Sequence, residues 1–160
     1  MNVLYTLLVF VHIIAVVFAF GPTFAYPLFV GVAEKTNPRA LPVIGVGIAT
    51  WDKVSVPLMA LIAIAGLTLV FMGYGSFNQF YVVWGIVATI AIFAQTIWFF
   101  MPKWKRLFEI VERDIEASGE GEVKFSAEYD ALKKQIDLGG LIVAIIIVYT
   151  IYVMVRKSPI

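Results

Sequence analysis

The chain contains no cysteine and only one histidine, His12. The absence of thiols excludes disulfides, thiolate catalysis and metal or cluster sites with cysteine ligands. The sequence also lacks a phosphate-binding glycine loop, the H-E-x-x-H zinc motif and the G-x-S-x-G nucleophile motif. The net charge of +1 leaves no basic stripe that could follow nucleic-acid phosphates, so we expect no nucleic-acid partner.

Charge is scarce along most of the chain. Charged residues make up 14% and apolar residues 61%, against roughly a quarter and a half in ordinary soluble domains. No Asp, Glu, Lys or Arg occurs in residues 3–33, 54–101 or 138–155. A transmembrane helix needs about 20 predominantly apolar residues. The middle stretch is therefore long enough for two helices, with a turn predicted at Gly73-Tyr74-Gly75-Ser76-Phe77-Asn78.

These runs predict an all-α fold, a four-helix transmembrane bundle that forms a single domain over residues 1–160. A cleaved signal peptide is the alternative for the first run, but Met1-Asn2 carries no positive side chain and no A-x-A-like site follows. The predicted spans cover about residues 3–30, 54–73, 80–101 and 138–155.

Basic residues are concentrated on one side of this topology. All Lys and Arg except Arg156 and Lys157 fall between the first and second or the third and fourth spans. Basic residues in short loops remain in the cytoplasm. We therefore expect an inner-membrane protein with both termini outside and these two loops in the cytoplasm.

The segment 103–137 is the one part of the chain that resembles soluble protein. Apolar residues recur at helical spacing in two stripes separated by a predicted turn at Ser118-Gly119-Glu120-Gly121, and Ser126 is a predicted N-cap. We expect an antiparallel helical hairpin, with docking of a protein partner as the alternative role for its stripes. The stripes consist of Leu107, Phe108, Ile110, Val111 and Ile115, and of Phe125, Tyr129, Leu132 and Ile136.

His12 is the first candidate for chemistry because it lies roughly 14 Å inside the first helix. Ionisable groups at such depth normally face the bundle interior, and Ala15, Ala19 and Thr23 share its face. Structural hydrogen bonding of neutral His12 is one interpretation; axial ligation of haem, a proton relay and a small-molecule site are the others. At comparable depth, roughly 9 to 12 Å, a polar layer is predicted from Thr68, Thr89, Tyr149 and Thr150.

Three further polar features lie in or beside the spans. Pro22 and Pro27 each remove a backbone hydrogen bond, so the first helix is expected to bend. Gln95 and Thr96 form a buried polar pair for which interhelical hydrogen bonding is expected, and lining of a pathway is the alternative. Asp52 and Lys53 are interpreted as a neighbouring ion pair at the interface. No metal site is predicted.

The chain resembles a family of uncharacterised four-helix bacterial integral membrane proteins. The resemblance rests on His12 within Leu8-Val9-Phe10-Val11-His12-Ile13-Ile14-Ala15, on Gly21-Pro22, on Arg39-Ala40 and on Ala65-Gly66-Leu67-Thr68. It is more distantly similar to the haem-containing protoporphyrinogen oxidase and to copper-resistance D proteins. That oxidase pairs a first-helix His with a later Lys; residues 80–101 contain no Lys.

The expected function is a small non-enzymatic accessory or partner-binding module in the lipid bilayer. The alternative is a haem-binding membrane redox protein with His12 as axial ligand. Haem is the cofactor that the distant similarity to the haem-containing oxidase implies. Small-molecule transport is third, because the spans contain no charge that could coordinate or couple an ion.

Overall fold

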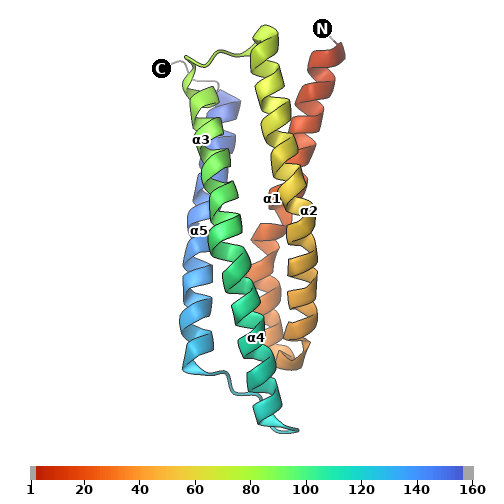
Figure 1. Ribbon diagram of the computed structural model, residues 1–160, viewed down its shortest axis with the longest axis vertical. Coiled ribbons are helices and arrows are strands. Elements are labelled where there is room, and N and C mark those ends of the chain that lie inside the picture. Colours follow the sequence, from red (N-terminus) through yellow and green to blue (C-terminus); the bar gives the residue numbers. More distant parts are fainter. Residues whose placement is uncertain (1–2, 157–160) are drawn as a thin grey trace.

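The computed structural model describes residues 3–156, and the all-α prediction is confirmed for this part of the chain (Figure 1). Lys157, one of the two basic residues expected on the outer side, lies outside the described residues. The helices are α1 (Val3–Thr36), α2 (Leu41–Leu69), α3 (Phe80–Gln95), α4 (Met101–Ser118) and α5 (Ala127–Arg156), with a 3₁₀ turn at Pro38–Ala40 and π-helical turns at Val70–Tyr74 and Thr96–Phe100.

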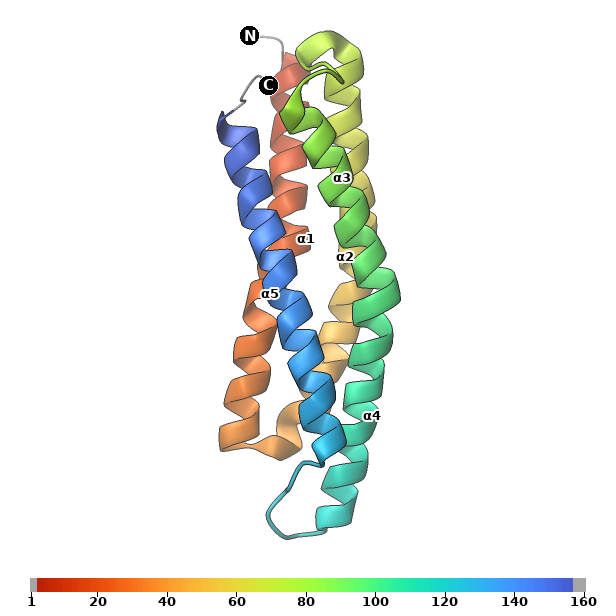
Figure 2. The same cartoon turned by 90° about the vertical axis from the view of Figure 1, so that its left-hand side faces the viewer.

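The elements form four long rods, because α3 and α4 are continuous through the π-helical turn between them. All four rods are long and apolar enough to cross a membrane, so the chain is a multi-pass membrane protein. Figures 1 and 2 show the N- and C-terminal helix ends and the 75–79 turn at one end of the bundle. We call this the terminal end. The opposite end, with the 37–40 and 119–126 connections, is the charged end.

The first two helices are longer than the predicted spans. α1 continues to Thr36 instead of ending near residue 30, and α2 begins at Leu41 instead of residue 54. At 1.5 Å per residue, the 34 residues of α1 extend about 51 Å, against roughly 30 Å of hydrocarbon. The bundle therefore continues beyond the uncharged stretches at its charged end.

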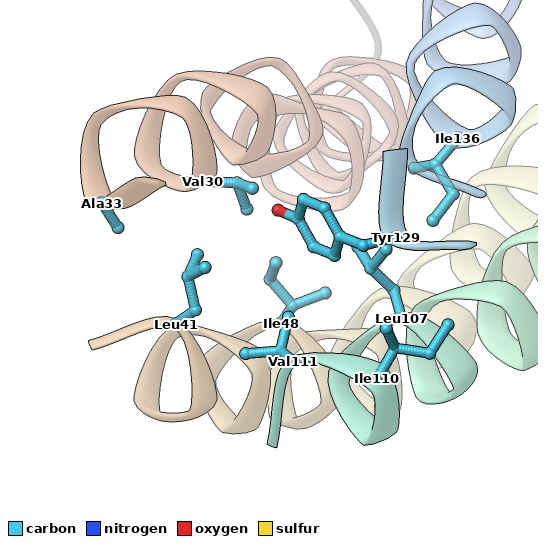
Figure 3. Close-up of a cluster of buried hydrophobic side chains, with 9 residues drawn as sticks. All are labelled: Val30, Ala33, Leu41, Ile48, Leu107, Ile110, Val111, Tyr129 and Ile136. Carbon is cyan, nitrogen blue, oxygen red and sulfur yellow. The ribbon is translucent and has the colours of Figure 1, made fainter. Parts of the chain in front are cut away.

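A hydrophobic core at the charged end explains this extension (Figure 3). The two stripes of segment 103–137 are buried as predicted, but they do not form a separate hairpin. They pack against α1 and α2, which cover the face that the hairpin would otherwise expose. The fully or nearly buried side chains are Val30, Ala33, Leu41, Ile48, Leu107, Ile110, Val111, Tyr129 and Ile136.

Tyr129 lies at the centre of this core and is only 2% exposed. Its hydroxyl points toward α1 in Figure 3 and donates a short hydrogen bond to Glu34. Lys133 lies 3.9 Å from the other Glu34 oxygen. The polar end of the largest buried side chain is therefore satisfied, as burial of a phenol requires.

A second core occupies the middle of the bundle. Ala15 and Ala19 of α1 are buried there, which confirms the predicted row of small residues. The Gln95 amide donates to the Gly139 carbonyl across α3 and α5 at 3.4 Å. This long contact is the interhelical hydrogen bond expected for Gln95. The core itself consists of Ala15, Ala19, Met59, Ile62, Ile92, Val143 and Ile147.

The predicted turns are confirmed at both ends. Gly73 and Gly119 adopt φ of 83° and 54°, a conformation that glycine tolerates better than other residues. Arg39 donates to the carbonyls of Gly119 and Gly121 at 2.5 and 3.0 Å, which joins the two connections of the charged end. The Ser126 hydroxyl accepts from the Tyr129 amide at 3.4 Å, the contact of an N-cap residue.

Candidate functional site

His12 faces α2, as expected for a group that turns inward. Its Nδ1 lies 3.0 Å from the Ile62 carbonyl oxygen, to which it donates in the neutral form with a proton on Nδ1. A Cβ added at Gly66 would lie 3.2 Å from the His12 ring. The ring therefore lies against the glycine surface of α2, and the contact supports the structural interpretation of His12.

The contact with Ile62 uses Nδ1, and Nε2 is the ring nitrogen that would bind haem iron. Ligating histidines commonly donate the other ring N–H to a backbone carbonyl, so this hydrogen bond fits both the structural interpretation and the axial-ligand hypothesis. His12 does not line the interior cavity described below. Packing against Gly66 accounts for the inward orientation of His12, and axial ligation of haem stays a prediction from the sequence.

The threonine hydroxyls of the predicted polar layer donate within their own helices and not to His12. The hydroxyls of Thr68, Thr89 and Thr150 donate to carbonyls of their own helices, each at 2.7 Å. Such local hydrogen bonds satisfy a hydroxyl in an apolar helix. Depth alone could not predict this outcome, because it leaves the rotation of each helix open.

Trp84 of α3 organises part of the predicted layer instead. Its indole N–H donates to the Thr150 hydroxyl at 2.9 Å. The Tyr149 ring packs edge-to-face against Trp84 with 5.0 Å between the centroids. Thr150 and Tyr149 therefore join α3 to α5 on a side of the bundle separate from the contact of His12 with α2.

Pro22 and Pro27 lie inside α1, and Figure 2 shows that α1 is not straight. Pro27 removes the amide that would bond the Thr23 carbonyl. Thr23 and Pro27 both line an interior cavity. The freed carbonyl therefore lies beside open space, one of the settings in which a broken helical hydrogen bond is tolerated in a membrane.

This interior cavity has a volume of about 60 Å³ and lies between the two cores. All four rods contribute to its wall. Thr96 lines it from the π-helical turn Thr96–Phe100, and its hydroxyl donates to the Ile92 carbonyl at 2.9 Å. π-helical turns are rare and occur frequently at functional sites. The polar lining residues are Thr23, Tyr26, Trp51, Asp52, Ser55, Thr96 and Asp137.

The π-helical turn has an identifiable cause in Pro102, which follows it. Proline lacks the N–H that would bond the Trp98 carbonyl, and its ring crowds that carbonyl. A wider turn relieves the crowding. It also places Phe100 and Thr96 on the cavity wall.

Two buried polar atoms, in residues that line the cavity, have no hydrogen-bond partner in the described part of the chain. They are the Tyr26 hydroxyl and the Trp51 indole N–H. A buried polar group without a partner costs about 1–3 kcal/mol, and such groups are few in native proteins. Both atoms are enclosed by protein and have almost no accessible surface, although other atoms of Tyr26 and Trp51 line the cavity.

Asp52 adds charge to the same wall. Its carboxylate is half-buried, and within residues 3–156 it forms no ion pair. The expected ion pair with Lys53 is therefore wrong: successive helical residues point in different directions, and Lys53 is exposed. The other acidic lining residue, Asp137, is neutralised by Lys133 at 2.7 Å.

Sequence reasoning missed Tyr26, Trp51 and Asp52 as a group. Tyr26 and Trp51 are 25 positions apart, and only the register of α1 against α2 brings them to one cavity. The available signal was the Trp51-Asp52 pair next to an uncharged stretch. Among the described residues, no cluster of three His, Asp or Glu could hold a metal ion.

No protein-family model, curated protein or solved structure matches this chain. The resemblance to uncharacterised four-helix membrane proteins, and the more distant similarity to the haem-containing oxidase and the copper-resistance proteins, remain predictions from the sequence. What the geometry itself identifies is a four-helix membrane bundle with a small, mostly apolar cavity between two apolar cores.

Proposed function

We propose that this protein is a non-enzymatic module of the inner membrane that binds another membrane protein through the charged end of α1 and α2. Its termini face outward and its charged end faces the cytoplasm. The concentration of Lys and Arg at the charged end supports this orientation, because basic loop residues remain cytoplasmic.

One observation carries the partner assignment, an exposed apolar face at the charged end. It consists of Leu28, Phe29 and Val32 on α1 and of Val43 and Val46 on α2, and these side chains are 51–74% exposed. We call it the α1–α2 face. None of the five side chains is charged, and the face continues the outward apolar stripe of α1.

The level of this face along the bundle makes it unusual. A Cβ on Gly45 would lie 2.6 Å from the Phe108 ring, so this part of α2 is level with α4 near residue 108. At that level α4 exposes Lys105, Arg106 and Glu109. The uncharged stretch of that rod ends at Met101, about 10 Å earlier. One side of the bundle thus stays apolar where the other side is charged.

An apolar face beside a charged one at the same depth is unfavourable if both meet water. A partner that covers the α1–α2 face removes that cost. Because the face is uncharged and continues from the lipid-facing surface, the partner it fits is an apolar helix of another membrane protein. The stripes of segment 103–137, for which docking was the alternative role, lie in the core at the charged end, so we assign the partner to the α1–α2 face instead.

Affinity purification of the full chain in a mild detergent tests the proposal. The wild type should retain a stoichiometric companion, and Val46→Glu should lose at least nine-tenths of it. Ala131→Glu is the matched control, since it adds the same charge at an exposed position of the charged end on α5. Purification of the wild type without a companion, or equal retention of the companion by both variants, would refute partner binding through this face. If the companion is a second copy of this chain, the face is a homodimer interface and the assignment of a different membrane protein is wrong.

A further inference from the structure

Acidic and basic side chains are segregated on α1 and α2, the helices that carry the α1–α2 face. Each helix has an acidic residue followed directly by a lysine, Glu34-Lys35 on α1 and Asp52-Lys53 on α2. Successive residues of a helix point in different directions. In both pairs the lysine is the exposed residue. The positive charge of each pair therefore lies on the outside of the bundle.

Both acidic side chains turn into the bundle. Glu34 accepts a hydrogen bond from the Tyr129 hydroxyl in the core of the charged end, and its side chain is only 19% exposed. Asp52 is half-buried and lines the interior cavity. They are the only acidic residues of α1 and α2. The exposed charged residues of the two helices and of the turn between them are therefore all positive: Lys35, Arg39 and Lys53.

The positive charge on this side is not neutralised within the protein. Within residues 3–156, neither Lys35 nor Lys53 forms an ion pair. On the opposite side of the charged end, Arg106 and Arg113 both pair with Glu128, at 2.7 and 3.0 Å. One side of the bundle thus balances much of its own charge, whereas the α1–α2 side presents an excess of positive charge.

The two lysines bound the apolar α1–α2 face. On α2 the exposed residues Val46, Thr50 and Lys53 follow one another at i, i+4 and i+7, which is one side of a helix. The Thr50 hydroxyl donates to the Val46 carbonyl at 2.7 Å, so it needs no partner from outside. On α1, exposed Lys35 follows Val32 at i+3. The face is therefore apolar in its middle and positive at each end.

The two lysines lie at different depths. Lys53 directly precedes the uncharged stretch 54–101, at the edge of the membrane span. Tyr26 and Asp52 line the same small cavity, so α1 near residue 26 is level with α2 near residue 52. From Tyr26 to Lys35, α1 rises about 14 Å, whereas a headgroup layer is about 5–7 Å thick. A lipid phosphate can reach Lys53, but only a partner that continues past the membrane surface reaches both lysines.

We infer, on the basis of the partner binding proposed above, that the partner is a transmembrane helix with an acidic residue at each end of an apolar stretch. One carboxylate pairs with Lys53 at the membrane edge, and the other pairs with Lys35 beyond it. Eleven residues is the first spacing beyond 14 Å that returns to the same side of a helix, at about 16.5 Å. Complementary charges at the two ends fix the register of the partner and exclude helices of the same sign.

The probe is a model transmembrane helix of leucine and alanine that carries two Glu eleven positions apart, the first at the membrane edge. A peptide with Gln at both positions is its uncharged match. Because the chain has no cysteine, Glu120→Cys in the exposed 119–126 connection provides one labelling site on the full chain. Energy transfer to labelled peptide in phosphatidylcholine bilayers at pH 7 measures association. We expect the Glu peptide to bind about tenfold more tightly than the Gln peptide.

Charge reversal on the protein provides the second comparison. Lys35→Glu and Lys53→Glu should each weaken binding of the Glu peptide about fivefold, because repulsion replaces an attraction. Lys134→Glu makes the same change at an exposed position of α5 and should bind as the wild type does. A third peptide, with Lys at both positions, should bind the double variant Lys35→Glu/Lys53→Glu more tightly than it binds the wild type. A gain of binding requires a folded protein, so it separates charge recognition from unfolding.

Four outcomes contradict the charge recognition. They are failure of the Glu peptide to bind the wild type, equal binding of the Glu and Gln peptides, an effect of Lys134→Glu as large as that of Lys53→Glu, and no gain for the Lys peptide. If native mass spectrometry then shows phosphatidylglycerol that the wild type retains and Lys53→Glu loses, the occupant is an anionic lipid. If the Glu and Gln peptides bind the wild type equally and Val46→Glu loses both, the face docks helices without regard to their charge. Partner binding then stands, and only the acidic character of the partner is wrong.

Discussion

Asp114 is the strongest polar link between the end of α4 and the start of α5. Its side chain is 8% exposed and accepts the Ser126 amide at 2.8 Å. The Arg113 guanidinium donates to its other oxygen at 3.0 and 3.1 Å. Asp114 thus satisfies the backbone N–H of the N-cap residue, at the point where the 119–126 connection enters α5.

We expect Asp114→Ala to lower the free energy of unfolding at the charged end by about 2 kcal/mol. Loss of the carboxylate leaves the Ser126 amide without its acceptor, and an unsatisfied donor costs about 1–3 kcal/mol. For a chain of this length, the midpoint of thermal unfolding should fall by about 4–8 °C. Thermal unfolding followed by circular dichroism in detergent at pH 7 measures the change. Glu112→Ala removes an exposed carboxylate of α4 and is the control.

The same residue predicts a pH dependence. Burial acts to raise the pKa of Asp114, but hydrogen bonds from Ser126 and Arg113 outweigh it and hold the pKa below 3.8. The stabilisation is therefore complete above pH 3.8 and is lost as the pH falls through the lower native pKa. The difference between wild type and Asp114→Ala should shrink below that pH. Equal midpoints for Asp114→Ala and Glu112→Ala at pH 7 would refute the assigned role.

Three further outcomes are expected. Gly45→Val should destabilise the charged end by about 1–3 kcal/mol, because its Cβ would meet the Phe108 ring at 2.6 Å; a melting temperature equal to that of the wild type would contradict this contact. His12→Ala should lower the free energy of unfolding by about 0.5–1.5 kcal/mol for its hydrogen bond, plus a further amount for lost packing. The wild-type protein purified from haem-replete cells should be colourless. A Soret band in the wild type that His12→Ala loses would instead support the axial-ligand hypothesis. Arg39→Gln should accelerate limited proteolysis in the 119–126 connection, where Arg39 holds two carbonyls; an unchanged cleavage rate would show that these contacts do not restrain it.

Most of the fold could be predicted from the chain because its signals are local. Length and absence of charge identify membrane spans without any knowledge of neighbours. Gly73 and Gly119 end helices through their own backbone conformation, and Ser126 caps α5 through the adjacent Tyr129 amide. Each of these features depends on residues a few positions apart.

The helix ends at the charged end could not be predicted in the same way. Charged residues at 34, 35 and 39 suggested that the first span ends near residue 30, yet α1 continues to Thr36. Its buried positions, Val30 and Ala33, belong to the core that residues of α2, α4 and α5 complete. Tertiary packing overrides a local charge signal when the charged side chains face outward, as Lys35 and Arg39 do, or find a partner inside, as Glu34 does in Tyr129.

The sequence by itself determined that this is a membrane protein with four rods, because hydropathy and helical length need only the order of residues. Tertiary structure decided which polar groups meet. Rotation and register of the helices separate His12 from Thr68 and Thr150, and they bring Tyr26, Trp51 and Asp52 to one cavity. Helical periodicity defines faces along each rod, but the faces that meet are set by packing of all four rods together.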